Sequence, residues 1–283
     1  MKLQYYVYFL NKTKQESLFQ DQKRNKKEIL LSVLEEGKPI QFEDSGSKYA
    51  FVVVEKENNY IYAKFGKRST IKRRMPPQDK FEELFEEDWP HCALFFNLDN
   101  DSNKGQRIAF EYKSSIFRNP YSQLKAFAEK INLCIFPSGY IMSISPVTQV
   151  QNFWDIVKVN KGKKIEKLSL IFNVPNLFNL DNELEDDLKS AQKDYGITKT
   201  KIELENPYEG INIPENNKLM KQGADYIAKG GGEYRIYLKE GKKVISSKEK
   251  TVTKTIKDLE IDIKSKDLGQ KELFSIFNKI FDL

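Results

Sequence analysis

The densest run of basic residues lies between residues 64 and 74, directly after a predicted strand. It carries six Lys or Arg side chains and no acidic one. Guanidinium and ammonium groups bind phosphate oxygens, so the run predicts contacts with nucleic-acid backbones. The alternative is a solvated loop that pairs with an acidic helix at 78–88. The basic members are Lys64, Lys67, Arg68, Lys72, Arg73 and Arg74.

A second basic tract covers residues 218–257. Its eleven basic and four acidic side chains leave an excess larger than the net charge of +6 of the whole chain. The triple glycine at 230–232 follows a predicted helix, so it is either a phosphate-binding loop or, as we favour, the turn that ends the helix. The tract predicts a basic surface. Its expected nucleic-acid contacts are Lys229, Arg235, Lys242 and Lys243.

An acidic pair and a Glu-x-Lys triplet provide an enzymatic alternative. Asp99 and Asp101 precede a predicted strand that contains Glu111 and Lys113. In many nucleases, carboxylates on neighbouring strands hold a divalent cation and a Lys orients the attacking water. Side chains alternate along a strand, so we expect Glu111 and Lys113 to face solvent, where a carboxylate binds magnesium weakly. We therefore expect no catalytic residues, no metal site and no cofactor.

Strands and helices at regular intervals must position these residues. Apolar alternation and turn residues in the first half predict two hairpins, at 49–65 and 92–113, and further strands at 4–10 and 139–145. Helical spacing of apolar residues predicts helices at 26–36 and 120–132, and the acidic segment 78–88 is also expected to be helical.

The pattern changes near residue 160, where we predict a domain boundary. The second half alternates between strands (167–173, 198–205, 233–240, 254–263) and helices (180–195, 217–229, 269–281), which is typical of a sheet with helices on one face. We expect Leu273, Phe277 and Ile280 of the last helix to dock on this sheet, and the alternative is that they form a dimer contact. The predicted fold class is α+β, with a strand-rich N-terminal domain at 1–160 and a C-terminal α/β-sandwich domain at 161–283.

Composition excludes several classes of protein. A single histidine, His91, leaves almost no material for His-rich metal sites or Ser-His-Asp catalysis. The only two cysteines, Cys92 and Cys134, exclude a disulfide scaffold and favour a reducing cytoplasm. No apolar run approaches the ~20 residues of a membrane span, and the first residues lack a signal-peptide cleavage site. We expect a cytoplasmic protein without membrane insertion.

The order of elements over residues 5–180 resembles that of the RexA-like phage-exclusion proteins of lambda-type prophages. The resemblance includes the apolar helix segment Ile29–Leu34, the strand segments Ala93–Phe96 and Arg107–Phe110, and the segment Val174–Phe178. It implies a cytoplasmic, DNA-binding homodimer that acts in abortive infection without established catalysis, and it allows for a partner protein of a defence system.

The residues and the resemblance together predict a sequence-tolerant DNA-binding protein of anti-phage defence that contacts backbone phosphates. Two alternatives remain open. One is a metal-dependent nuclease built on Asp99, Asp101, Glu111 and Lys113. The other is a protein-interaction module that does not bind nucleic acid.

Overall fold

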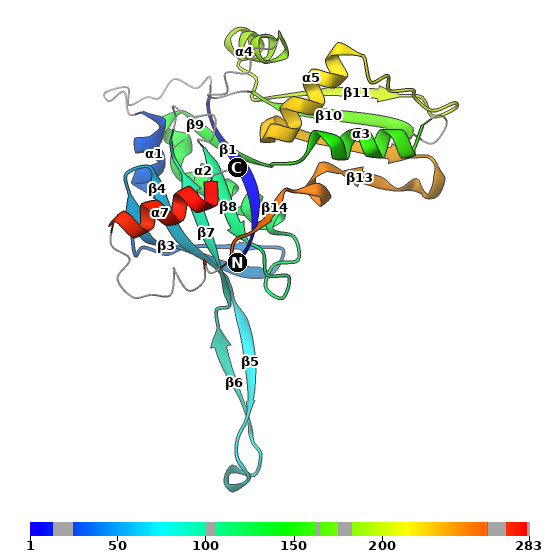
Figure 1. Cartoon of the computed structure of the whole chain (residues 1–283). Helices are drawn as coiled ribbons and strands as arrows, with labels where there is room; N and C mark the ends of the chain where they lie inside the picture. The colour runs from blue at the N-terminus through cyan, green and yellow to red at the C-terminus, as the bar shows by residue number, and fades with distance from the viewer. Residues whose placement is uncertain are drawn as a thin grey trace.

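The computed structural model describes residues 1–13, 25–99, 106–161, 165–174, 183–257, 259 and 270–281 (Figure 1). These residues form an eight-stranded sheet, a four-stranded sheet and a two-stranded hairpin, and the paired strands in each are antiparallel. Helices cover the two larger sheets, so the predicted α+β class is confirmed. No helix in this part of the chain is long and apolar enough to cross a membrane.

The first sheet contains both hairpins predicted from apolar alternation. Its strand order is β14-β1-β8-β7-β4-β3-β2, and β9 also pairs with β1. Asn58 adopts a left-handed conformation in the turn between β3 and β4, as expected for a short hairpin connection. The strands are β1 (Lys2–Lys12), β2 (Ile40–Asp44), β3 (Ser47–Glu57), β4 (Tyr60–Lys67), β7 (His91–Asn97), β8 (Arg107–Glu111), β9 (Tyr140–Pro146) and β14 (Thr253–Thr255).

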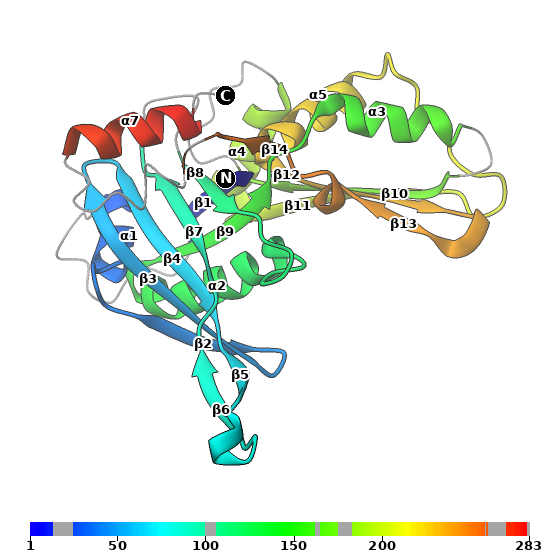
Figure 2. The same ribbon diagram turned by 60° about the horizontal axis from the view of Figure 1, so that its bottom comes forward.

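A hydrophobic core lies on each face of the first sheet (Figure 2). Helices α1 (Lys26–Val33) and α2 (Pro120–Ile135) cover one face, and α7 (Gln270–Phe281) covers part of the other. Along β1, Tyr6 and Tyr8 pack in the core beneath α1 and α2, whereas Leu3 and Tyr5 pack in the core beneath α7. The almost continuous apolar sequence of β1 is therefore that of a strand buried on both sides.

The expected docking of the last helix on the C-terminal sheet is wrong. The side chain of Leu273 lies outside the described structure. Phe277 and Ile280 of α7 pack against the first sheet, at Tyr5, Tyr62 and Phe95, and β14 pairs with β1. The reason is that this second face of the first sheet is apolar and needs a cover, while the outer face of the C-terminal sheet carries charged side chains. Thus the chain returns to its first sheet after residue 252.

The second sheet has helices on one face, as predicted. Its order is β11-β10-β12-β13, formed by β10 (Ile165–Asn173), β11 (Lys199–Glu205), β12 (Gly232–Leu238) and β13 (Val244–Ser246). Helices α3 (Val150–Val159), α4 (Glu183–Tyr195) and α5 (Lys218–Tyr226) share a core with β10 and β12. The packing crosses the predicted domain ranges at two places. Helix α3, from the range 1–160, packs on the second sheet, whereas β14 and α7, from the range 161–283, pack with the first sheet.

The segment predicted as an acidic helix, 78–88, forms part of the turn and one strand of a projecting hairpin. Strands β5 (Ser69–Arg74) and β6 (Glu83–Asp88) pair only with each other and extend away from both sheets (Figures 1 and 2). The helix prediction for 78–88 is wrong because the acidic residues of β6 lie across from β5, whose basic side chains they can bind. Pro76 and Pro77 begin the turn that separates the two strands.

The triple glycine forms the turn that ends a helix, which is the interpretation favoured from the sequence. Helix α5 continues into a π turn at Ile227–Gly231, where Gly230 has a φ of +91°. A Cβ on Gly232 would collide with the carbonyl oxygen of Ile171 in the neighbouring strand. A Cβ on Gly230 or Gly231 would likewise collide with Val7 or Tyr226, so the glycines allow close packing at this turn.

Candidate nucleic-acid interface

The basic run at 64–74 lies on strands, not on the expected loop. Lys64 and Lys67 belong to the end of β4, and Lys72 to Arg74 belong to β5. Across the hairpin, Arg68 binds Glu87, Lys72 binds Glu83 at 2.6 Å, and Arg73 binds Glu86 at 3.0 Å. The acidic strand therefore offsets half of the predicted cluster.

The projecting hairpin has no net charge. Between residues 67 and 88, six basic side chains stand beside six acidic ones. Three members of the predicted cluster, Lys64, Lys67 and Arg74, have no ion pair among the described residues. Because its charges balance, this hairpin by itself attracts a polyanion only weakly.

The four residues selected from the second basic tract have different surroundings. Lys229 forms an ion pair with Asp225 at 2.8 Å on the surface of α5. Lys243 is exposed, and the side chain of Lys242 lies outside the described structure. Arg235 forms an ion pair with Glu233, which lines a cavity.

A polar cavity of about 270 Å³ separates the two sheets. Asn11 of β1 and Ser143 of β9 lie on its floor, since these two strands pair side by side. Helix α2 forms one wall with Tyr121 and Lys125, and the ends of β10, β11 and β12 form the other. We call this cavity and its rim the inter-sheet groove.

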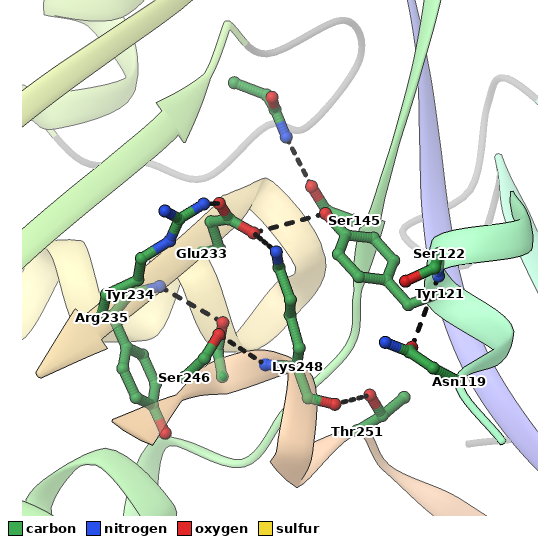
Figure 3. Close-up of polar contacts among 12 residues, drawn as sticks. Asn119, Tyr121, Ser122, Ser145, Glu233, Tyr234, Arg235, Ser246, Lys248 and Thr251 are labelled. Atoms are coloured by element: carbon green, nitrogen blue, oxygen red, sulfur yellow. Dashed lines mark hydrogen bonds and ion pairs between the residues drawn. The ribbon is translucent and has the colours of Figure 1, made fainter. Parts of the chain in front are cut away.

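A cluster of cations lies at this groove, and Figure 3 shows two of them, Arg235 and Lys248, bound to the carboxylate of Glu233. Arg235 of β12 donates to Oε1 of Glu233 at 2.7 Å, and Nζ of Lys248 lies 3.4 Å from Oε2. Lys125 of α2 and Lys199 of β11 line the cavity beside them. Glu233 itself is only 6% exposed, while Glu129 is the other acidic side chain at the rim and is exposed.

The pKa shifts of Glu233 and Lys125 reflect both burial and the charges around them. Burial by itself raises the pKa of Glu233, but the hydrogen bond from Arg235 and the charges of Lys248 and Lys125 outweigh it and lower that pKa. Burial lowers the pKa of Lys125. Glu233 opposes this shift, and the neighbouring charges of Lys248, Lys199 and Arg235 add to it. These cations repel one another, so an additional anion would be attracted to the groove.

Tyr121 holds two of the cations in position. Its ring stacks on Tyr6 with 6.2 Å between centroids, and its hydroxyl donates to Glu233 at 3.4 Å. The ammonium groups of Lys125 and Lys248 lie 5.0 and 5.2 Å from the ring centroid. The quadrupole of an aromatic ring attracts cations at this distance.

Sequence reasoning identifies Arg235 but misses Lys125, Lys199 and Lys248 as a group. Lys125 and Lys199 lie outside both basic segments of the sequence, and Lys248 lies within the 218–257 tract but is not among the four residues selected from it. One local signal is available, because Lys125 follows Tyr121 by four residues and therefore lies on the same side of the helix.

Among the candidate nuclease residues, the structure pairs Glu111 with Lys113 but separates Asp99 from both. Glu111 contacts the amide of Ala93 across the β7–β8 pair, and Asp99 follows Ala93 by six residues, which corresponds to roughly 20 Å along a strand. Asp101 lies outside the described residues. In the described part of the chain, no group of three His, Cys, Asp or Glu side chains is placed to hold a metal ion.

The expectation that Glu111 faces solvent is also wrong. Glu111 is 3% exposed, accepts a hydrogen bond from the Ala93 amide at 2.9 Å and binds Lys113 at 2.7 Å. The alternation along β8 is as expected, but the face of the first sheet that carries Glu111 is buried rather than open. Lys113 is exposed, as expected.

Glu111→Gln should affect stability rather than activity. The amide can still accept from Ala93, but it loses the charge-assisted contact with the half-exposed Lys113, so we expect a loss of about 1 kcal/mol in unfolding free energy. Urea denaturation measures this loss. DNA incubated with magnesium should stay intact with both proteins. Cleavage by the parent that disappears in the variant would contradict this assignment and support a nuclease.

Comparisons with models of protein families, with curated protein sequences and with solved structures gave no match. The RexA-like resemblance therefore stays a prediction, and the functional argument depends on the geometry of the groove.

Proposed function

We propose that the protein binds nucleic acid by its phosphate backbone in the inter-sheet groove. The observation that carries this proposal is the cluster of Lys125, Arg235 and Lys248 around Glu233, with Lys199 lining the same cavity near Lys125. Surface lysines and arginines that serve only solubility are solvated one by one and do not have to lie close together. A half-buried cluster with excess positive charge is suited to anionic oxygens, which form charge-assisted hydrogen bonds with these groups.

The open face of the second sheet extends the groove with aromatic surface. Tyr237 of β12 lies beneath Lys167 of β10, whose Nζ is 5.6 Å from the ring centroid. Glu203 binds both Lys167 and Lys201 at 2.9 Å, so this face adds little net charge. A partly exposed tyrosine beside a basic groove favours stacking of unpaired bases, which tolerates any sequence.

DNA is the nucleic acid that the RexA-like resemblance implies, and binding through phosphates makes it sequence-tolerant. The homodimer, the role in phage exclusion and a partner protein of a defence system are implied by the resemblance alone. They stay predictions that the groove neither requires nor excludes.

Two charge-matched triple variants test the proposal. Lys125→Ala/Lys199→Ala/Lys248→Ala should weaken binding roughly 10–100-fold at low salt, at about 0.5–1 kcal/mol for each ammonium–phosphate pair. It should also reduce the slope of log affinity against log salt concentration by about one for each phosphate that the protein no longer neutralises. Lys64→Ala/Lys67→Ala/Arg74→Ala removes the same charge from the neighbourhood of the hairpin and should change affinity much less. Fluorescence anisotropy with labelled oligonucleotides over a salt series measures both.

Two results would contradict the proposal. If the parent protein binds neither single-stranded nor duplex nucleic acid at low salt, the groove is not a nucleic-acid interface. If the second variant loses affinity and the first does not, the interface lies at the run 64–74 that the sequence predicts.

A further inference from the structure

The floor of the inter-sheet groove carries polar atoms without partners. Asn11 is 1% exposed, lines the cavity, and its side-chain Oδ1 has no hydrogen-bond partner among the described residues. The hydroxyl oxygen of Ser143, on the adjacent strand β9, is likewise buried and unpartnered in this part of the chain.

Asn11 interrupts an otherwise apolar face. By strand alternation, Val7 and Phe9 share its side of β1, and both are buried. A buried amide oxygen without a donor destabilises the fold, and a leucine of similar size would avoid this cost. A polar residue at this position is explained if a ligand supplies the missing hydrogen bond.

Neighbouring polar groups are fixed in place around this floor. Asn173 of β10 donates to the hydroxyl of Ser145 at 2.7 Å, and its backbone carbonyl accepts from Tyr226 at 2.7 Å. On the opposite wall, Asn132 of α2 donates to the carbonyl of Met142 at 2.9 Å. The floor therefore presents neutral hydrogen-bonding groups on a rigid frame, and the wall and rim supply the cations.

The size of the cavity limits the ligand. At ~30 Å³ for each water molecule, about 270 Å³ holds on the order of ten waters, close to the number of heavy atoms in one nucleobase. Neutral hydrogen-bonding groups at the floor suit the edge of a base, and the ammonium groups of Lys125 and Lys199 suit its phosphate.

We infer that the inter-sheet groove takes one unpaired nucleotide of a single strand, with its base over Asn11 and Ser143 and its phosphate at Lys125 and Lys199. This inference rests on the proposed function. In a duplex the edges of the bases are paired, so a base enters such a pocket only after it is flipped out of the helix. The protein should therefore bind a single strand more tightly than the same strand in a duplex.

Asn11→Leu separates a ligand-binding role from a structural one. The variant should melt at a higher temperature than the parent, since it removes the unpartnered oxygen. Its affinity for a single-stranded oligonucleotide of mixed sequence should fall about five- to tenfold, whereas affinity for the duplex should stay within about twofold. Ser143→Ala is a milder second variant, expected to shift affinity in the same direction, in case Asn11→Leu does not fold.

Gln123→Leu is the matched control. Gln123 of α2 also has a buried, unpartnered side-chain oxygen among the described residues, but it does not line the cavity. Its replacement makes the same chemical change elsewhere and should leave the affinity for both strand forms unchanged.

The outcomes distinguish this inference from the proposed function. Loss of single-strand preference in Asn11→Leu with unchanged salt dependence supports the inference. A stable Asn11→Leu variant that binds single strands like the parent overturns the inference and leaves the proposed function intact. A parent protein that binds no oligonucleotide overturns both. If adenosine monophosphate raises the melting temperature of the protein but no oligonucleotide binds, the cavity is a site for a free nucleotide. That result overturns the inference that the nucleotide belongs to a strand.

Discussion

Replacing Phe277 with alanine should lower the unfolding free energy by roughly 3–5 kcal/mol, the usual cost of removing a fully buried aromatic ring. Phe277 is completely buried between α7 and the first sheet. Its ring lies 4.5 Å from that of Tyr60, 5.6 Å from that of Phe95 and 5.9 Å from that of Phe281, measured between centroids. Urea denaturation followed by far-ultraviolet circular dichroism gives the change in unfolding free energy.

Phe274→Ala is the control on the same helix. The side chain of Phe274 is 54% exposed and meets only the edge of the Tyr60 ring at 6.1 Å, so we expect a loss below about 1 kcal/mol. A dimer that dissociates in Phe277→Ala without any change in monomer stability would show that α7 forms a subunit contact instead of covering the core.

Replacing Glu233 with glutamine should make the protein less stable and its nucleic-acid binding tighter. Glu233 is the buried carboxylate that offsets the charges of Arg235, Lys248 and Lys125. Its loss leaves these cations without a buried counter-charge. Because the Arg235 and Lys248 side chains are 37% and 28% exposed, solvent screens part of the repulsion, and we expect a cost of about 1–3 kcal/mol.

The stability difference should depend on pH in one direction. The fold lowers the pKa of Glu233 below its ordinary value of 4.5, so the ionised carboxylate stabilises the folded state. This contribution is complete above the ordinary pKa and is lost as the pH falls through the lower, folded-state pKa. The parent and Glu233→Gln should therefore differ most near neutral pH and converge in acid, as chemical denaturation at several pH values would show.

The effect on binding should have the opposite sign. Removing the carboxylate raises the charge of the inter-sheet groove by one, so affinity for a polyanion should increase about three- to tenfold at low salt and depend more steeply on salt. Glu129→Gln, at the exposed rim, should raise affinity less and leave stability unchanged. Weaker binding by Glu233→Gln, with the fold intact, would contradict the groove as a site for polyanions.

The local elements of this protein are readable from its sequence. Helix α2 is predictable because Tyr121, Leu124, Phe127, Ala128 and Ile131 recur at helical spacing, and all five are buried. The hairpins β3–β4 and β7–β8 are predictable from apolar alternation interrupted by polar turns. In each case the signal lies within about 20 consecutive residues, over which backbone periodicity selects the residues that face the core.

The errors arise where the partner of a segment is distant or lies across a turn. The acidic segment 78–88 has helix-compatible composition, but its carboxylates bind Arg68, Lys72 and Arg73 on the opposite side of the hairpin. Glu111 is expected in solvent because nothing near it in the sequence indicates that its face of the sheet is buried. That burial is a tertiary effect, to which α7 contributes from the far end of the chain.

The inter-sheet groove depends entirely on tertiary structure. The sequence by itself determined that basic residues exceed acidic ones and that the excess is largest in the C-terminal tract. It could not indicate that β6 offsets the run 64–74, or that Lys125, Arg235 and Lys248 surround one carboxylate beside a cavity that Lys199 also lines. The composition of a sequence gives the number of charges, but their electrostatic effect depends on the distances between them and on their burial. At this groove, the packing of the second sheet against α2 and β9 determines these distances and this burial.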